Sequence, residues 1–348
     1  MQLFSLSQRA FMATTSLAGA LRSIPRASFS SGSGSVKWDG GVSMVQGASR
    51  GIGLEFVKQL LEKNDKGHVI ATCRNPNAAT GLLDLKNKFA ERLDILQLDL
   101  TVESTIEASA KSITERYGSL NLLINASGIL SIQNVLQPEF NPAMYHPIMN
   151  QLKANCLFEL VIRALNLFSS IFSTETTLNK VERSSLMLAY EINAVGPILV
   201  MKFEDLCHHL ILPMCLHFQH MWPLLKVGGG TGTEREVAVV ANLSARVGSI
   251  GDNRLGGWHS YRASKAALNQ LTKTVSLEFA RRKDPVICIM LHPGTVDTDL
   301  SRPFQRNVPE DKLFTKEFSV QKLLSIIENT KKHDNGKFFA WDGQEIPW

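Results

Sequence analysis

The chain has 348 residues, of which 44% are hydrophobic and 20% charged, and its formal net charge at pH 7 is +5. Such a composition is typical of a globular protein with one large α/β domain or two small ones. The charge is mild and part of it lies near the N-terminus, so it gives no reason to expect a nucleic-acid-binding surface. No stretch reaches the roughly 18 uninterrupted apolar residues that cross a bilayer, and we expect no membrane span.

The first 36 residues differ from the rest of the chain. They contain Arg9, Arg22 and Arg26, nine serines and no acid, since the first acidic residue is Asp39. That composition predicts an organelle transit peptide over residues 1–36, cleaved between about residues 26 and 37. We expect a mitochondrial protein first and a plastid protein second. A disordered leader on a cytosolic protein is the alternative.

The five cysteines form no C-x-x-C pair, which predicts free thiols rather than a disulfide framework. The run "CHHLILPMCLHFQH", residues 207–220, combines cysteines and histidines, but its spacing fits no familiar zinc motif. We therefore expect no metal site.

The stretch "GVSMVQGASRGIGLEFVKQLLEK" combines a short apolar run with Gly47, Gly51 and Gly53. Apolar residues then recur at helical spacing from Ile52 to Leu61. A strand, a glycine turn and a helix in this order bring backbone N–H groups and the positive end of a helix close to a pyrophosphate. The stretch therefore predicts a dinucleotide site.

The next predicted strand, "HVIATCRNP", indicates which dinucleotide is bound. NAD sites usually place an acid about 20 residues past the glycines to bind the ribose hydroxyls. Here Arg74 follows the strand instead, and Arg50 lies inside the glycine turn. Because two guanidinium groups suit a 2′-phosphate, we expect NADP(H), with NAD(H) as the weaker alternative.

Further apolar, β-prone runs alternate with helical ones, such as the predicted helices over residues 104–117 and 262–282. Near-continuous apolar strands that alternate with helices predict a Rossmann-type, doubly wound, mostly parallel seven-stranded sheet with helices on both faces. We expect one such domain over residues 37–348. The remaining predicted strands are "DILQLDL", "LNLLINASG", "VAVVANLSA", "VICIMLHPG" and "KFFAWDG".

The stretch "SYRASKAALNQL" places Tyr261 and Lys265 one helical turn apart. Such a pair also arises by chance, so its meaning depends on the context in which it stands. An unperturbed tyrosine has a pKa of about 10, too high for a base at neutral pH. A lysine ammonium on the same helix face is expected to stabilise the phenolate and to lower the pKa of the tyrosine.

With that context the sequence resembles the short-chain dehydrogenase/reductase family, and within it the C-factor-like and sniffer-like carbonyl reductases. The resemblance runs from about residue 42 to the C-terminus, apart from two inserts. It implies an NAD(P)-dependent oxidoreductase that transfers hydride to or from a carbonyl or alcohol. The landmarks follow in order: "GASRGIG", "LDLT", "NASG", "INAVG", "NLSARVGSIG", "YRASK" and "HPGTVDTDL".

The resemblance also implies site residues. Tyr261 becomes the proton donor or base, Lys265 its tuning partner and ribose ligand, and Asn193 the anchor of a relay water. Ala126 and Ser127 depart from the usual N-N-A-G motif. The resemblance, together with the glycine turn, gives these cofactor-binding residues: Gly47, Ser49, Arg50, Gly51, Ile52, Gly53, Arg74, Asp99, Leu100, Asn125, Ala126, Gly128, Tyr261, Lys265, Pro293, Gly294, Val296 and Thr298.

The family's substrate-binding serine has no exact counterpart in this sequence. It usually stands three residues before a glycine, and counting back from Gly248 reaches Ala245, which has no hydroxyl. Neighbouring residues of a strand face opposite ways, unless the strand bends at its end. We expect Ser244 to assist the substrate carbonyl, with Tyr261 as the sole donor if it does not.

Two apolar stretches, near residues 140–174 and 203–219, interrupt the family pattern. The second separates "INAVGPILVMK" from "HMWPLLK", which read together as one helix ending near Gly228. Our preferred interpretation is unspliced or misassigned gene sequence, because unpaired apolar inserts favour aggregation. A lid or a partner surface is the alternative. In either case the insert puts a homodimer or tetramer in doubt.

Two functions of different class therefore stay open. The first is an NADPH-dependent oxidoreductase acting on a small-molecule carbonyl or alcohol. The second is an NADP(H)-binding sensor or scaffold with little catalysis. Tyr261 and Lys265 favour the first, whereas the inserts and the altered N-N-A-G motif favour the second.

Overall fold

The computed structural model describes residues 40–130, 175, 181–202, 220–229 and 236–348. The described residues belong to one compact unit, Lys37–Trp348. The predicted leader and the two predicted inserts, 140–174 and 203–219, lie outside the described residues.

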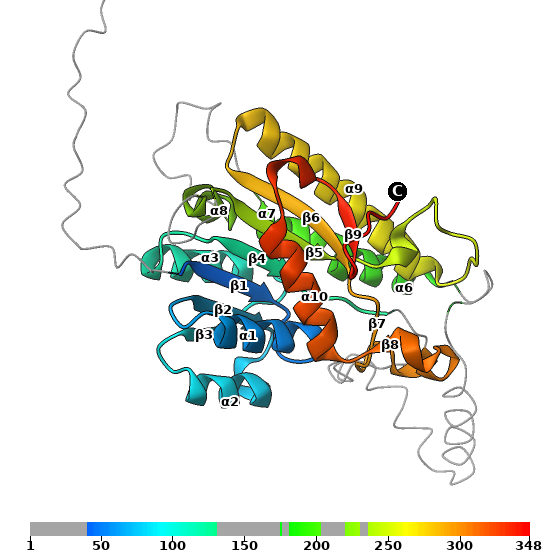
Figure 1. Ribbon diagram of the computed structural model, residues 1–348, viewed down its shortest axis with the longest axis horizontal. Helices are drawn as coiled ribbons and strands as arrows, with labels where there is room; N and C mark the ends of the chain where they lie inside the picture. The colour runs from blue at the N-terminus through cyan, green and yellow to red at the C-terminus, as the bar shows by residue number, and fades with distance from the viewer. Residues whose placement is uncertain (1–39, 131–174, 176–180, 203–219, 230–235) are drawn as a thin grey trace, which may run out of the picture. The chain divides into compact units, whose positions relative to one another are not determined.

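A parallel sheet of seven strands forms the centre of the fold (Figure 1). Its order is β3-β2-β1-β4-β5-β6-β9, and every neighbouring pair runs parallel, which confirms the predicted doubly wound fold. A second, two-stranded sheet pairs β7 with β8. The strands are β1 Val42–Gln46, β2 His68–Cys73, β3 Leu93–Gln97, β4 Leu122–Asn125, β5 Ala238–Leu243, β6 Val286–His292, β7 Thr295–Val296, β8 Leu313–Phe314 and β9 Phe338–Ala340.

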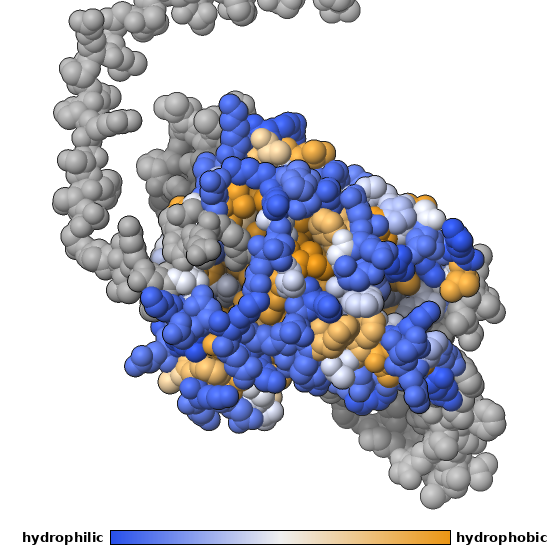
Figure 2. All heavy atoms as spheres, viewed as in Figure 1, coloured by the Kyte–Doolittle hydropathy of each residue, from blue (hydrophilic) through white to orange (hydrophobic). Residues whose placement is uncertain are grey.

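Helices cover both faces of the sheet, and each face has its own hydrophobic core. Side chains alternate along a strand, so Val45 packs into the core under α1, α2 and α10, whereas Met44 packs into the core under α3, α7 and α8. The helices are α1 Gly51–Lys63, α2 Thr80–Lys88, α3 Glu103–Arg116, α6 Arg183–Tyr190, α7 Gly196–Met201, α8 Trp222–Gly228, α9 His259–Arg282 and α10 Lys316–Asn329. Figure 2 shows a mostly hydrophilic face over this fold, with small separate hydrophobic patches.

Helices α6 and α7 form one continuous run, joined by a π-helical turn, η4 (Glu191–Val195). Among the described residues this run, Arg183–Met201, is the one helical stretch long and apolar enough to cross a membrane by length and composition. The cores of soluble proteins contain helices that meet the same criterion. Here 39% of the apolar window is buried, and the run packs against α9, while Met187 on its outer side stays exposed.

Helices α7 and α8 meet in space although residues 203–219 separate them in the sequence. The Met221 N–H donates to the Val200 carbonyl at 3.1 Å. Without those seventeen residues Met221 would stand four positions after Val200, which is the spacing of an α-helical hydrogen bond. This bond is the one that the predicted single helix would have at the junction, and α8 ends at Gly228 as expected.

Candidate active site

The predicted site residues gather where the strands end, at the carboxyl edge of the sheet. Gly47 follows β1 with φ +80°, a conformation that L side chains rarely adopt, and a Cβ there would overlap the Ser127 hydroxyl. A Cβ on Gly53 would overlap the Gly47 carbonyl. The turn therefore requires glycine, and it leads into the N-terminus of the 13-residue helix α1, which suits a pyrophosphate. Ser49 and Ile52 are half-buried in the same turn.

The two predicted phosphate ligands lie at this edge as well. Arg50 is the N-cap of α1, its side chain is 77% exposed, and its guanidinium lies 3.7 Å from Asp299. Arg74 is exposed directly after β2. Both cations can therefore reach solvent beside the glycine turn, as a 2′-phosphate ligand must.

Asp99 and Leu100 follow β3. The Asp99 carboxylate accepts hydrogen bonds from the backbone N–H and hydroxyl of Thr101, at 2.9 and 2.8 Å. Leu100 is buried against Gly196, the first residue of α7. These contacts fix the loop, and they give Leu100 a packing role.

Asn125, at the end of β4, donates to Asn242 of β5 at 2.8 Å and links the central strands. Ala126 is half-buried after it, and Ser127 accepts a hydrogen bond from Gln46 of β1 at 2.7 Å. The altered N-N-A-G motif therefore keeps a link between β1 and β4 through the serine hydroxyl. Gly128 ends the motif.

Asn193 lies in the π-helical turn η4 and is completely buried. Its amide clamps the loop after β4, because Oδ1 accepts from Ile129 N at 2.8 Å and Nδ2 donates to Ile129 O at 2.9 Å. A Cβ on Gly128 would lie 3.5 Å from both Asn193 Oδ1 and Lys265 Nζ. The structure therefore brings Asn193, Gly128 and Lys265 together, as predicted.

Tyr261 and Lys265 share one face of α9, with Lys265 Nζ 5.9 Å from the centre of the tyrosine ring. Lys265 is 3% exposed and donates to the Leu243 carbonyl at 2.8 Å. Burial lowers the pKa of Lys265 to about 7 and raises the pKa of Tyr261 to about 12. The pKa of Tyr261 thus lies above its ordinary value, contrary to the prediction, and desolvation is the cause.

Ser244 is buried after β5, and its hydroxyl lies 2.6 Å from Asn269 Oδ1 on α9. Since a carboxamide oxygen only accepts, the serine proton is directed at Asn269. Ala245, the neighbouring residue, is 8% exposed. The role of Ser244 toward the substrate stays a prediction, but its hydroxyl first serves to tie β5 to α9. No motif marks Asn269 in the sequence.

The stretch after β6 closes over the glycine turn. A Cβ on Gly51 would lie 3.7 Å from Thr298 Cγ2, so the predicted carboxamide-binding stretch and the phosphate turn are neighbours. Gly294 has φ +79° and lies against Phe314, and the Pro293 carbonyl accepts a hydrogen bond from Ser319 at 2.8 Å. Val296 is buried nearby. Together with the first turn of α1, these residues fit a bound dinucleotide.

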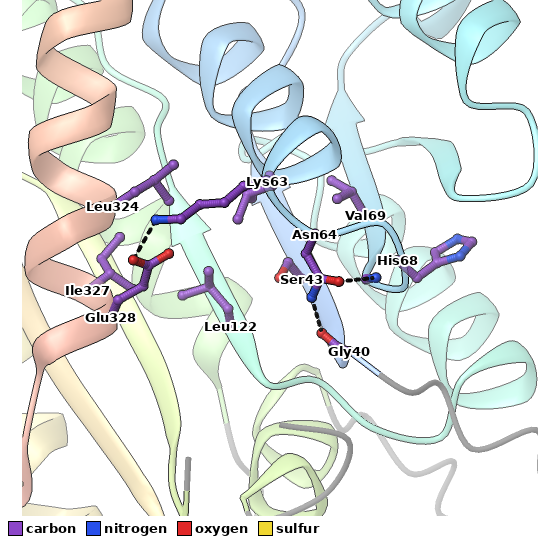
Figure 3. A pocket seen from close by; sticks show the side chains of 12 residues that line it. Gly40, Ser43, Lys63, Asn64, His68, Val69, Leu122, Leu324, Ile327 and Glu328 are labelled. Carbon is purple, nitrogen blue, oxygen red and sulfur yellow. Dashed lines mark hydrogen bonds and ion pairs between the residues drawn. The ribbon is translucent and has the colours of Figure 1, made fainter. Parts of the chain in front are cut away.

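A small pocket of about 100 Å³ lies at the opposite edge of the sheet (Figure 3). It is lined by the start of β1 and the ends of α1 and α10, where Lys63 pairs with Glu328 at 2.5 Å. Ligand pockets usually enclose roughly 300 Å³ or more, and this one lies away from every predicted site residue. It is therefore not the dinucleotide site.

Three possible metal ligands lie close together on the α3 side of the sheet. Glu103, Glu107 and His220, the last residue of the run considered for zinc, offer ligand atoms within 4.8 Å of one another. However, Lys202 Nζ donates to Glu103 at 2.9 Å and His220 Nε2 lies 3.3 Å from the same carboxylate. The carboxylate is thus already neutralised by an ammonium, which disfavours a cation.

One residue of this region could not have been found from the sequence. Glu175 is 3% exposed, and its carboxylate accepts hydrogen bonds from the backbone N–H and the hydroxyl of Ser260, at 2.7 and 2.6 Å. Ser260 directly precedes Tyr261. Glu175 lies just after the stretch that we interpreted as an insert, where no motif marks it.

The fold and this edge of the sheet define a Rossmann-type dinucleotide-binding oxidoreductase. The family model for short chain dehydrogenases matches residues 42–184 and 199–309, and the chain belongs to this family. It is thus an oxidoreductase by family.

Relatives include carbonyl reductases of known structure. The NADPH-bound carbonyl reductase from chicken fatty liver is 30% identical, with a TM-score of 0.64 over 89% of this chain and 99% of that chain. The carbonyl reductase Sniffer of D. melanogaster is 24% identical, with a TM-score of 0.63 over 89% and 99% of the two chains. The C-signal protein of Myxococcus xanthus is 29% identical over 49% of this chain and 83% of its own length. The predicted family and subgroup are confirmed.

Proposed function

We propose that this chain is an NADPH-dependent reductase of carbonyl compounds in which Tyr261 donates the proton. The observation that carries the proposal is the buried pair on α9. With a pKa near 12, Tyr261 keeps its proton at neutral pH and can give it to an oxygen that gains negative charge.

The bound nicotinamide would supply hydride to the carbonyl carbon, and this chain's residues supply the rest. Tyr261 O–H donates its proton to the carbonyl oxygen, which yields an alcohol and a phenolate. Lys265 Nζ, held by the Leu243 carbonyl, lies where it can stabilise that phenolate and bind the ribose. Asn193 holds the loop after β4 against this pair through Ile129.

The cofactor preference rests on Arg50 and Arg74. The chicken carbonyl reductase, which is similar over nearly its whole length, is NADPH-bound, and this supports the same cofactor here. We expect tighter binding of NADPH than of NADH. Arg74→Ala should weaken NADPH binding roughly tenfold or more and leave NADH binding nearly unchanged, because a charge-assisted bond contributes about 1.5–3 kcal/mol. Equal affinities of the wild type for the two cofactors would rule this preference out.

The residues beside Tyr261 suggest a flat, apolar substrate. The Trp258 ring centre is 6.2 Å from that of Tyr261, and Phe304, in the loop after β7, meets Trp258 edge-on at 4.7 Å. Aromatic side chains supply large apolar contact area. We propose that aromatic aldehydes, aromatic ketones or quinones are reduced faster than short aliphatic carbonyls.

The test is NADPH oxidation by the purified chain against matched aromatic and aliphatic aldehydes, ketones and quinones. Turnover that exceeds the enzyme-free rate and requires Tyr261 supports the reductase. NADPH binding without turnover across the panel would instead support the sensor or scaffold function.

We also propose import into an organelle, from the acid-free leader over residues 1–36. Mitochondria are the first expectation and plastids the second. Residues 1–40 fused to a fluorescent protein should enter the organelle, and a fusion that stays in the cytosol would refute the proposal.

A further inference from the structure

The first turn of α9, which carries Tyr261, lacks an ordinary helix cap. Its N-cap is Trp258, whose side chain makes no capping hydrogen bond, and no acid stands in the first turn. The backbone N–H groups of a first turn have no partner within their own helix. In buried surroundings they require an acceptor from elsewhere in the chain.

Glu175 supplies that acceptor. Its carboxylate accepts from Ser260 N at 2.7 Å and from Ser260 Oγ at 2.6 Å, and its backbone carbonyl accepts from Trp258 N at 2.7 Å. Both Glu175 and Ser260 are almost completely buried, at 3% and 1% exposure. A negative charge at the positive end of a 24-residue helix is also electrostatically favourable.

The same contacts hold the backbone in an uncommon conformation. Trp258 has φ +58°, in the left-handed region, where a bulky residue persists only if its surroundings enforce it. The hydrogen bond from its N–H to Glu175 is one such constraint. The Trp258 ring lies beside the rings of Tyr261 and Phe304.

We propose that Glu175 is a positioning residue of the reaction, which holds residues 258–260 so that Tyr261 O–H points at the substrate carbonyl. The inference rests on the proposed function, because it concerns the geometry of the proton donor. Glu175 itself need not touch the substrate. Without it the first turn of α9 would loosen, and proton transfer is sensitive to such displacement.

The experiment compares Glu175→Ala and Glu175→Gln with a control that loses a helix cap elsewhere. The control is Thr315→Ala, since Thr315 caps α10 by accepting from Phe318 N at 3.2 Å. Each variant is assayed for kcat, KM, NADPH affinity, melting temperature, and the primary isotope effect with NADPH deuterated at the transferred hydrogen.

We expect Glu175→Ala to lower kcat roughly 10- to 100-fold with little change in NADPH affinity, as for a misplaced reacting group. Its isotope effect should rise, because the chemical step becomes slower relative to cofactor release. Glu175→Gln should recover most of the lost kcat, since the amide oxygen can still accept from Ser260 N. Thr315→Ala should lower the melting temperature without lowering kcat.

A kcat for Glu175→Ala no lower than that of Thr315→Ala would overturn the inference. If Glu175→Ala does not fold, Ser260→Ala carries the test, because it removes one of the three bonds. Wild-type kcat and isotope effect in Ser260→Ala would then overturn it. Tyr261→Phe separates the two proposals. Wild-type turnover in Tyr261→Phe refutes the proposed function. If Tyr261→Phe is inactive while Glu175→Ala has the wild-type kcat, only the inference about Glu175 is refuted.

Discussion

Buried titratable groups favour their neutral forms at one edge of the sheet, whereas one near the other edge stays charged. At the carboxyl edge, burial drives Tyr261, Lys265 and His292 toward their neutral forms, and the pKa of His292 falls to about 4. Near the amino edge, Asp94 stays charged. The difference lies in the partners, because among the described residues no carboxylate pairs with Lys265, whereas Asp94 is surrounded by donors and cations.

The Asp94 cluster shows how that charge is kept. Arg116 lies 2.6 Å from its carboxylate and Lys86 3.4 Å, and Tyr117, which also contacts His68, donates to it. Burial alone would raise the pKa of Asp94, but these hydrogen bonds and charges lower it below its usual range. Buried groups that lack such partners, in a site, are candidates for chemistry rather than for stability.

Removing the proton donor should have the largest effect. Tyr261→Phe keeps the ring but loses the hydroxyl, so kcat should fall roughly 100-fold or more, as for a lost general acid. NADPH affinity, measured by fluorescence titration, should stay nearly unchanged. Wild-type turnover in this variant would mean that Tyr261 is a packing residue. The buried groups of the carboxyl edge would then have no shown role in the chemistry.

Breaking the Asp94 cluster should reduce stability and leave the chemistry intact. Asp94→Asn should lower the free energy of unfolding at pH 7 by about 2 kcal/mol. This is less than the loss of a fully buried ion pair costs, because Arg116 is half exposed and solvent screens its charge. Because the folded pKa of Asp94 is depressed, its contribution is full above the ordinary value of 3.8 and is lost as the pH falls below it. Denaturant titrations at pH 7 and pH 3 should show the difference between variant and wild type shrinking.

The buried lysine should show a pH dependence of the same sign, at higher pH. Lys265 has a pKa depressed from 10.5 to about 7, so between these values the unfolded chain binds more protons than the folded one. The wild type should therefore gain about 1–2 kcal/mol of stability relative to Lys265→Met as the pH rises from 7 to 10. The exposed Lys111→Met, on α3, is the control. A difference that is constant with pH would mean that Lys265 is solvated.

The smallest effect is expected from Ser244→Ala. Because the hydroxyl faces Asn269, kcat should fall far less than the roughly 100-fold that loss of an oxyanion donor costs. Ala245→Ser, which places a hydroxyl at the family's usual position, is the companion variant. A 100-fold loss in Ser244→Ala would support the predicted role of the serine toward the substrate carbonyl.

Much of this architecture could be predicted because long apolar runs in the sequence indicate buried strands. Runs such as "VAVVANLSA" are apolar on both faces, which indicates a central parallel strand, and β5 lies there. The glycine turn could also be predicted from the spacing of its glycines. The structure shows why, since there is no room for a side chain at Gly47 or Gly53.

The electrostatics and the long-range contacts of the site could not be predicted in this way. The spacing of Tyr261 and Lys265 shows that they share a face but not how deeply the face is buried, and burial reverses the expected shift of the tyrosine. Ser244 and Asn269 lie 25 positions apart, and Glu175 and Ser260 lie 85 apart. Such contacts form only in the assembled fold, and no periodic pattern in the sequence indicates them.

The hydrogen bond from Met221 to Val200 has a consequence for how this fold accepts added chain. A segment inserted at this junction leaves at least the bond from Met221 N–H to the Val200 carbonyl in place. The cost of closing a loop of seventeen residues is about 2.5 kcal/mol plus a constant. Deleting residues 203–219 removes this cost, so the melting temperature should rise and NADPH binding should be retained. Loss of folding on deletion would contradict this. We therefore expect that chain can be added or removed after Lys202 while the dinucleotide edge stays unchanged.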